Sequence, residues 1–501
     1  MSDISYRTSN QKISIWYTAL LSAAVLWAIF NCAYVYLVLA GGRTYRIESS
    51  VLFFVALLIP TALARAAVAR NLELPRRWLW AIAVGAAAMW LAIMAPLVTY
   101  PFLSDDYVFF GRYQSWSDLF SSQIFFRPLF SGVFWFCARI GDGSTIPFHI
   151  VGFILHGGCA ALVGLLARRI LRSATAGFVS FTLFLVNPLQ LEATLWVSGL
   201  QELLCAFLVL SAALVYSRGL EPTLRTALAA TPFIIFALLS KETAVGYLLF
   251  LPVLDLALGR IKRGSEVWRN YLLFAGIAIA YLIVRSRFTV ADAGFLAEPS
   301  RYFFKQLVTL PYKFFAQPWN AEAVRTPLVV SFALCAAVLM LLYASGVANR
   351  LSRVSLAGSL IVISFTLPVY TYFFVAPDLA GSRYLYLPCV GWVLLLADVL
   401  TSTLRRSAVL VVPVVLIAFA SLVVLRLNLR PWMTASDAIA VMERAIERNL
   451  SPLDALNAWE AQRSIRLTRR GNVPIEYQGV YILLNGHEEF VRFASARVAA
   501  R

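Results

Sequence analysis

The chain has 501 residues, of which 60% are hydrophobic and only 14% are charged, and its mean hydropathy is +0.75. Soluble domains are closer to one half apolar and one quarter charged, so this composition excludes an ordinary set of soluble domains. The net charge of +17 suggests a nucleic-acid partner. The basic residues, however, lie in short clusters between apolar runs, which is typical of membrane orientation signals. We therefore expect a protein of the lipid bilayer with no nucleic-acid partner.

Long apolar runs recur along most of the chain. A membrane-spanning helix needs about 20 mostly apolar residues. Such runs lie at 14–40, 50–69, 78–100, 148–167, 176–194, 200–217, 226–240, 243–259, 270–285, 327–346, 355–376, 385–402 and 407–425. The first run is too long for the core of a signal peptide and lacks a clear cleavage site, so we expect a retained anchor. The sequence predicts an all-α polytopic membrane protein with about 13 transmembrane helices within residues 1–425.

The distribution of Lys and Arg predicts the orientation of these spans. Short cytoplasmic loops carry an excess of basic residues. The basic loops between the runs are 69–77, 167–173, 217–225, 260–269, 348–353 and 403–406. If these loops face the cytoplasm, the N-terminus does too, and the spans alternate without a break. The outer loops 101–147 and 286–326 are then extracytoplasmic, as expected for a multi-pass protein of the bacterial inner membrane.

Two outer segments have a pattern of their own. Residues 301–319 alternate aromatic and basic side chains, which predicts a helix lying in the membrane interface. Residues 432–449 have the pattern of an amphipathic helix, and residues 473–486 predict a strand pair bounded by Gly and Pro. We therefore expect residues 426–501 to form a small soluble α+β domain on the extracytoplasmic face.

Two adjacent carboxylates, Asp105 and Asp106, follow an apolar run in the stretch LSDDYVFF. Neighbouring carboxylates repel each other, and burial raises the pKa of at least one. Such a group suits a general base that works near neutral pH. The simpler interpretation is that the pair caps the next helix or marks a hydrated loop, and for an isolated Asp-Asp at a membrane edge it is the more frequent one.

Three cations on the same predicted face are candidates for binding a phosphate. Lys241 and Glu242 interrupt an apolar stretch of about 30 residues, and charges near hydrocarbon usually pair or function. The alternative is a plain turn in which these two residues pair with each other. Arg383 lies at the outer end of a span and can donate two parallel hydrogen bonds to a phosphate. The alternative for Arg383, and equally for Arg127, is snorkelling to the membrane interface.

Other polar groups give weaker signals. His149 and His156 are seven residues apart and share a helix face, and we expect packed, hydrogen-bonded histidines rather than metal ligands. Glu192 and Glu202 flank an outer turn, so a divalent cation is a candidate cofactor, although none is certain. The six cysteines lie mostly in apolar segments without a pairing pattern, as small core residues do. No Walker loop, dinucleotide-binding glycine pattern or HExxH motif occurs.

Four stretches occur in a familiar order. They are LSDDYVFF, the segment from FFRPLF to ILHGGCAALV, the segments LFLVNPLQLEATLWVSGLQELLCAF and ALLSKETAVGYLLFLPVLDL, and SRYLYLPCVGW. Together they resemble the GT-C superfamily of polytopic glycosyltransferases. The resemblance is greatest to the protein O-mannosyltransferase branch, which includes the transmembrane proteins with tetratricopeptide repeats and their bacterial relatives. It covers roughly residues 100–400, and the ordered set is more specific than any single motif.

The resemblance implies an inverting transferase that uses a polyprenyl-phosphate-linked sugar on the extracytoplasmic face. The acceptor it implies is a hydroxyl of a protein or glycan. By motif position, Asp105 or Asp106 is the catalytic carboxylate, and Arg383 and Lys241 lie near the donor phosphate, with Arg127 as a further candidate. The supporting positions that it implies are His156, Glu192, Glu242 and Tyr384.

The chain departs from the family pattern at several places. Asn187 stands where the family usually has His, and Gln201-Glu202 replace the usual Arg-x-Asp pattern after Gly199. A short tail takes the place of the tetratricopeptide repeats. The sequence therefore leaves open the sugar, the acceptor and the effect of these departures on activity.

Two other classes of protein are consistent with this composition. A transporter or lipid-linked-sugar flippase is also polytopic, and Lys241 or Glu242 would then lie on its pathway. That interpretation predicts repeated halves with broken helices, which the sequence does not clearly contain. The other alternative is a membrane scaffold whose residues 426–501 bind a partner.

Overall fold

The structure is a computed structural model that describes residues 76–113, 115–120, 125–219, 221–261, 267–288, 303, 310–315, 353–369, 381–403, 411–463 and 487–499. Within these ranges every regular element is a helix, either α or the shorter 3-10 type (η). The first half comprises α3 Arg76–Met94, η1 Ala95–Thr99, α4 Asp105–Arg112, η2 Trp116–Phe120, α5 Pro128–Gly141, α6 Ile146–Ile170, α7 Ala174–Leu185, η3 Pro188–Gln190, α8 Leu191–Leu195, η4 Val197–Gly199 and α9 Leu200–Tyr216. The second comprises α10 Leu224–Ser240, α11 Ala244–Tyr247, α12 Phe250–Leu258, α13 Val267–Phe288, α15 Leu310–Phe315, α17 Arg353–Thr366, η9 Leu367–Val369, η10 Ser382–Leu385, α18 Pro388–Thr403, α19 Val411–Glu447, α20 Pro452–Arg463 and α21 His487–Ala499.

Several of these helices are suited to a membrane. In the described part of the chain, four are long and apolar enough to cross a bilayer, and a fifth span arises if the bent pair α7 and Pro188–Leu195 counts as one. These spans make the chain a multi-pass membrane protein. The remaining apolar helical segments have only 10–17 residues, so the predicted count of thirteen spans is not confirmed. The predicted spans 14–40, 50–69 and 327–346 lie outside the described residues.

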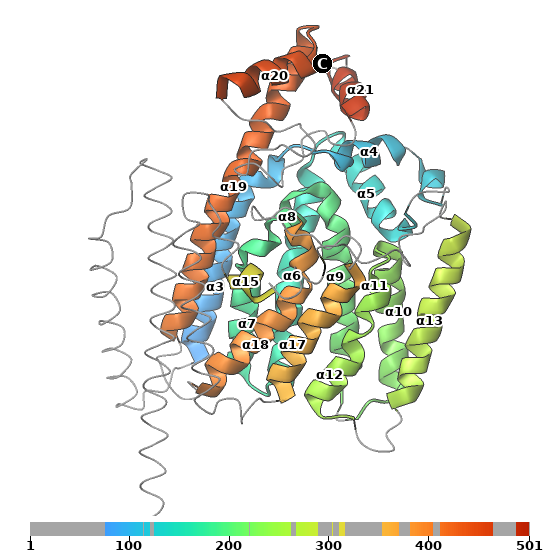
Figure 1. Cartoon of the computed structure of the whole chain (residues 1–501), viewed down its shortest axis with the longest axis vertical. Helices are drawn as coiled ribbons and strands as arrows, with labels where there is room; N and C mark the ends of the chain where they lie inside the picture. The colour runs from blue at the N-terminus through green and yellow to red at the C-terminus, as the bar shows by residue number, and fades with distance from the viewer. Residues whose placement is uncertain are drawn as a thin grey trace, which may run out of the picture.

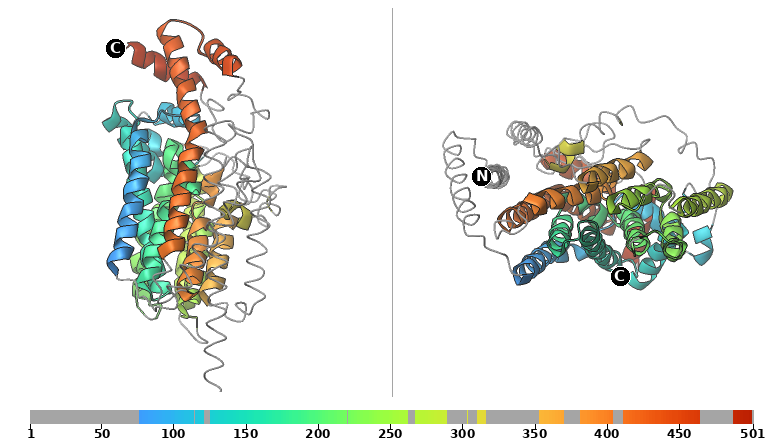
Figure 2. Two further views of the ribbon diagram at one scale, coloured as in Figure 1. Left: turned by 90° about the vertical axis from the view of Figure 1, so that its left-hand side faces the viewer. Right: turned by 90° about the horizontal axis from the view of Figure 1, so that it is seen from below.

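The described helices pack side by side in two layers. One layer contains α3, α6, α7, α9 and α10, and the other contains α17, α18 and α19 (Figures 1 and 2). Close packing between α17 and α18 depends on glycine, because a Cβ on Gly391 would collide with the carbonyl oxygen of Gly358. Small residues at such a crossing let two backbones approach in a membrane protein.

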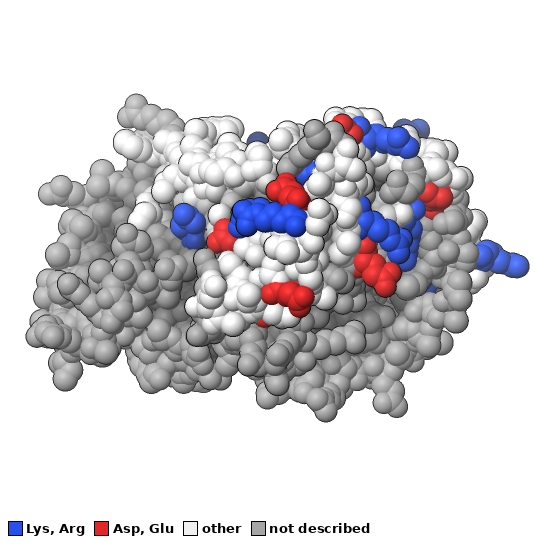
Figure 3. All heavy atoms as spheres, turned by 90° about the horizontal axis from the view of Figure 1, so that it is seen from above, with Lys and Arg blue, Asp and Glu red and all other residues white. Residues whose placement is uncertain are grey.

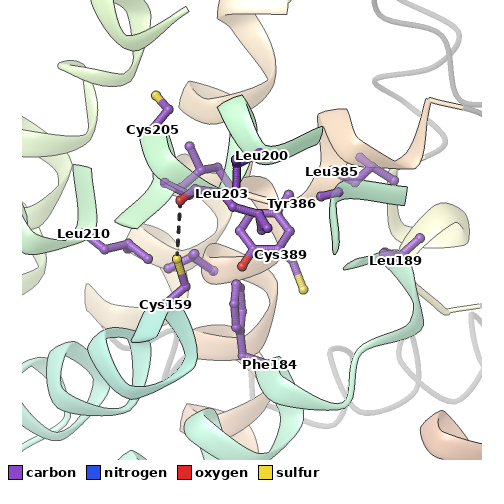
Figure 4. Close-up of a cluster of buried hydrophobic side chains, with 14 of the residues drawn as sticks. Cys159, Phe184, Leu189, Leu200, Leu203, Cys205, Leu210, Leu385, Tyr386 and Cys389 are labelled. Carbon is purple, nitrogen blue, oxygen red and sulfur yellow. Dashed lines mark hydrogen bonds between the residues drawn. The ribbon is translucent and has the colours of Figure 1, made fainter. Parts of the chain in front are cut away.

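Cysteines contribute to the core as the sequence predicts. Cys159, Cys205 and Cys389 are buried among aliphatic and aromatic side chains (Figure 4), and the thiol of Cys159 lies 3.9 Å from the carbonyl oxygen of Leu203. Cys137 is buried as well, and all four are free thiols. Cys32 and Cys335 lie outside the described residues.

A buried ion pair closes the end of the bundle away from α4. Asp255 lies 3.1 Å from the Nε of Arg260 and accepts hydrogen bonds from the hydroxyls of Tyr216 and Tyr271 at 2.8 and 2.7 Å. Arg260 also donates to the carbonyl oxygen of Tyr216 at the last turn of α9, 3.2 Å away. These contacts tie α9, α12 and α13 together, so we assign this cluster a structural role.

A single helix crosses the boundary predicted between the membrane module and the C-terminal domain. Helix α19 runs from Val411 to Glu447 across the predicted boundary between residues 425 and 426, and it projects beyond the bundle to carry α20 and α21 (Figure 1). The amphipathic helix predicted at 432–449 is thus the outer end of a longer helix. The predicted strand pair at 473–486 lies outside the described residues, as does most of the predicted interfacial helix at 301–319.

Candidate functional site

Apart from His156, which lies within α6, the predicted site residues lie at or near helix ends in the half of the bundle that carries α4. Where a helix breaks, backbone N–H and C=O groups lose their partners within the helix and need others. Helices α7 and α8 meet at a bend of 49°, where Pro188 has no N–H to donate. The side chain of Asn187, which stands where the resembled family usually has His, accepts a hydrogen bond from the N–H of Leu189 at 2.9 Å. Asn187 therefore caps the turn that leads into α8.

The acidic pair opens α4, and its two members have different environments. Asp106 is completely buried, whereas Asp105 is half-buried. One carboxylate oxygen of Asp106 accepts from the N–H of Leu103 at 2.9 Å, and the other accepts from the N–H of Ser198 at 2.7 Å and from its hydroxyl. Asp106 therefore joins α4 to η4, and both of its oxygens are engaged.

Burial of Asp106 has a consequence for stability. It raises the pKa of this carboxyl from 3.8 to about 7, although the hydrogen bonds from Ser198 and Leu103 oppose the shift. Between these two values the folded protein holds a proton that the unfolded chain has released. The free energy of unfolding should therefore fall as pH rises from about 4 to about 7, and then level off.

This pH dependence is testable in detergent. We expect the melting temperature of wild-type protein to decrease across that pH window and the decrease to be smaller in Asp106→Asn, which cannot ionise. Asp142→Asn is the matched control, because Asp142 is exposed. Equal pH slopes in wild type and Asp106→Asn would contradict the assignment.

Arg383 is linked to the segment before the acidic pair through Trp196. The side chain of Trp196 donates to the carbonyl oxygen of Leu103 at 3.2 Å, and the guanidinium of Arg383 lies 4.9 Å from the Trp196 ring. Arg383 pairs with Glu192, which also accepts from the backbone N–H of Arg383 at 2.9 Å. The guanidinium is further stacked at 4.7 Å over Tyr384. Trp196 thus connects Arg383 to the segment that leads into α4.

Lys241 extends this cluster through Tyr384. Its ammonium group lies 5.7 Å from the Tyr384 ring and forms an ion pair with Glu202. Lys241 and Glu202 are both almost fully buried. Glu202 is half of the Gln201-Glu202 departure from the family pattern, so that departure supplies the counter-ion of a predicted site residue.

Arg127 and Glu242 form the third ion pair. The Nε and Nη2 atoms of Arg127 donate to the two carboxylate oxygens of Glu242, 2.7 and 2.5 Å away, and Nη1 donates to the side chain of Gln201. Glu242 therefore pairs with Arg127 and not with its neighbour Lys241, so the alternative prediction of a mutual Lys241–Glu242 pair is wrong. The two neighbours follow each other at the end of α10, but their side chains meet counter-ions from different segments. Lys241 pairs with Glu202 of α9, and Glu242 pairs with Arg127, which precedes α5.

Gly199 allows these segments to approach closely. A Cβ there would lie 2.7 Å from the carbonyl oxygen of Ala193, so only glycine lets η4 pack on α8. This contact brings Ser198 to Asp106 and Glu192 to Arg383. Ser198 and Trp196 are the residues that sequence reasoning missed, and their position within the motif LEATLWVSG was the available signal.

His156 lies apart from this charged cluster. Its Nδ1 is 2.8 Å from the hydroxyl of Tyr386, and its Nε2 is 3.0 Å from the carbonyl oxygen of Leu185. His149 Nε2 is 2.9 Å from the carbonyl oxygen of Tyr100. These contacts agree with packed, hydrogen-bonded histidines. Among the residues that the structure places, no group of three or more His, Cys, Asp or Glu side chains is arranged to hold a metal ion.

The fold and this cluster define a class: a multi-pass helical membrane protein with three largely buried ion pairs, one of which is linked through Trp196 to the segment before an acidic pair. The chain is similar to a protein O-mannosyl-transferase of Caenorhabditis elegans, with 25% identity over 312 residues. The match covers 58% of this chain and 44% of that relative, so the chain matches less than half of the relative's length. No family model matches the chain. No solved structure matches it significantly.

Proposed function

We propose that this protein is a membrane glycosyltransferase of the GT-C type. It would move a sugar from a polyprenyl-phosphate donor to an acceptor hydroxyl on the extracytoplasmic face, with inversion at the anomeric carbon. The observation that carries the proposal is the series of contacts that links Asp106 to Arg383 through Leu103 and Trp196, and Arg383 to Lys241 through Tyr384. The similarity to a protein O-mannosyl-transferase supports the same class of reaction.

The two carboxylates have separate roles in this proposal. Asp106 uses one oxygen to hold α4 against η4 and the other to accept from the N–H of Leu103, so it positions its neighbour. Asp105 is half-buried and stands in the first turn of α4, where a substrate hydroxyl can approach it. We therefore assign the general base to Asp105, since a base must lie within hydrogen-bond reach of the proton that it removes.

The three cations also have separate roles in this proposal. Arg383 is the most exposed of the three, with 18% of its side-chain surface accessible, against 6% for Lys241 and 7% for Arg127. Arg383 is therefore the group best placed to meet a donor phosphate, with Lys241 behind it across the Tyr384 ring. Arg127 directs its Nε, Nη1 and Nη2 atoms to Glu242 and Gln201, and we assign it a positioning role.

These side chains account for the acceptor proton and for the charge on the leaving phosphate. Asp105 takes the proton of the acceptor hydroxyl as its oxygen forms a bond to the anomeric carbon. The bond between that carbon and the donor phosphate oxygen breaks, and the phosphate leaves with the electron pair. Arg383 and Lys241 stabilise the negative charge that develops on this phosphate. A divalent cation held by the outer carboxylates stays a candidate for the same task.

The experiment that tests this proposal is a transfer assay with purified protein. Incubation with a polyprenyl-phosphate mannose and a serine- or threonine-rich peptide should release polyprenyl phosphate and yield mannosylated peptide, both detected by mass spectrometry. Parallel assays with and without a chelator decide whether a metal is needed. Release of neither product, with movement of the intact lipid-linked sugar across vesicles, would instead support the flippase alternative.

A further inference from the structure

Helix α4, which carries the acidic pair, cannot hold its position by itself. It has eight residues, and Ser104 before it has a φ of 48° and makes no side-chain capping hydrogen bond. Isolated helices shorter than about 12 residues are marginal in water. The left-handed backbone at Ser104 adds strain, because φ above zero is unfavourable for residues other than glycine. Contacts with other parts of the chain must therefore fix α4.

One side of α4 packs on its sequence neighbour α5. The ring of Phe109 lies 5.4 Å from that of Phe130 and 6.0 Å from that of Phe134, measured between centroids. Both α5 rings are completely buried. These contacts join segments that are close in the sequence, and they leave the opposite side of α4 to be covered by another element.

That other side is covered by α21, close to the C-terminus. The ring of Phe490 lies 5.1 Å from that of Tyr107, and the ring of Phe493 lies 5.6 Å from Tyr107 and 4.9 Å from Phe110. Phe493 also meets Phe102, in the loop before α4, at 5.7 Å. Phe490 is fully buried and Tyr107 is 1% exposed. The edge-on geometry of the Tyr107–Phe490, Phe110–Phe493 and Phe102–Phe493 pairs adds directional stability to the burial of apolar surface.

Helix α21 is itself attached to the rigid part of the molecule. It packs on α19, and Arg497 lies 3.5 Å from Glu443 of that helix. Helix α19 is tied in turn to the segment before α4, because the hydroxyl of Tyr100 donates to the carbonyl oxygen of Trp432 at 2.6 Å. The path from α19 through α21 to α4 thus closes on the segment that leads into α4 and the acidic pair. Figure 1 shows α21 above α4 at the end of α19.

We propose that α21 is a positioning element for the acidic pair, and that Phe490 and Phe493 hold α4 in the orientation that places Asp105 at the site. Its effect on sugar transfer rests on the proposed function, but the coupling between α21 and α4 does not. The outer face at this end of the described chain carries side chains of both charges (Figure 3). Seen from the end that carries α20 and α21, basic and acidic side chains lie next to one another in Figure 3, so a patch of one charge does not cover this end of the described chain.

The test compares Phe490→Ala/Phe493→Ala with two other full-length variants. Phe490→Leu/Phe493→Leu keeps apolar volume at both positions, and Ser495→Ala is the matched control on an exposed position of α21. Hydrogen exchange by mass spectrometry reports on α4, with peptides from α9 and α10 as the measure of global folding. In the double Ala variant we expect α4 amides to exchange at least ~10-fold faster, while α9 and α10 stay unchanged.

Transfer kinetics supply the second readout. A misplacement of ~1 Å can cost about 100-fold in rate, so we expect kcat of the double Ala variant to fall by that order with the donor KM unchanged. The double Leu variant should recover most of both losses. Unchanged exchange in α4, or faster exchange with an unchanged kcat, would overturn the proposal. If wild-type protein transfers no sugar, the proposed function fails, and the exchange data alone decide whether α21 positions α4.

Discussion

Replacing Asp105 with Asn is expected to reduce sugar transfer roughly 100- to 10,000-fold, the contribution that a positioned general base makes. The substitution keeps the shape of the side chain but removes its ability to take the acceptor proton. Asp105 is half-buried and lies in the first turn of α4, so we expect the melting temperature to change little. Release of polyprenyl phosphate from a saturating donor is the measurement, because it reports kcat directly.

Two comparisons make this prediction decisive. Asp142→Asn is the same chemical change at an exposed position and should keep wild-type transfer. Asp106→Asn should also lose transfer, but with altered stability, because Asn has a single side-chain oxygen and its NH2 group would face the N–H of either Leu103 or Ser198. If Asp105→Asn and Asp106→Asn both transfer sugar at the wild-type rate, the carboxylate mechanism is wrong.

Replacing Arg383 with Met should abolish transfer and also destabilise the protein. Arg383 pairs with Glu192, which is 3% exposed. Removing one partner of a buried pair costs about 3–5 kcal/mol, because it leaves an uncompensated charge. Since the Arg383 side chain is 18% exposed, we expect the lower end of that range. Thermal unfolding and transfer kinetics measure the two effects separately.

A double variant separates the structural effect of Arg383 from its chemical one. In Arg383→Met/Glu192→Gln no charge is left unpaired, and the Gln oxygen can still accept a backbone hydrogen bond at residues 381–383. We expect this variant to recover stability but not transfer, because the donor phosphate still lacks its cation. The control is Arg139→Met, an exposed position on α5. Wild-type transfer and donor KM in the double variant would show that Arg383 does not bind the phosphate.

The amino-acid sequence determined the class of protein and the position of the polar groups along the chain. Apolar runs of about 20 residues predict helices because each helix satisfies its own backbone hydrogen bonds in a membrane. Helices occur at the predicted runs from 78–100 to 270–285 and from 355–376 onward wherever the structure describes them. The predicted convergence of Asp106, Lys241 and Arg383 follows from the same alternation, since residues at the same ends of successive helices meet.

Only the tertiary structure decided which charges pair and how the environments of the two neighbouring carboxylates differ. Arg127 and Glu242 are 115 residues apart, and Asp106 and Ser198 are 92 apart. Sequence reasoning left open a pair between the neighbours Lys241 and Glu242, but each of these meets a partner from a different helix end. Such pairings depend on packing between segments far apart in the chain, which a local pattern does not contain. For the same physical reason the covering of α4 by Phe490 and Phe493 is visible only once the helices are placed in space.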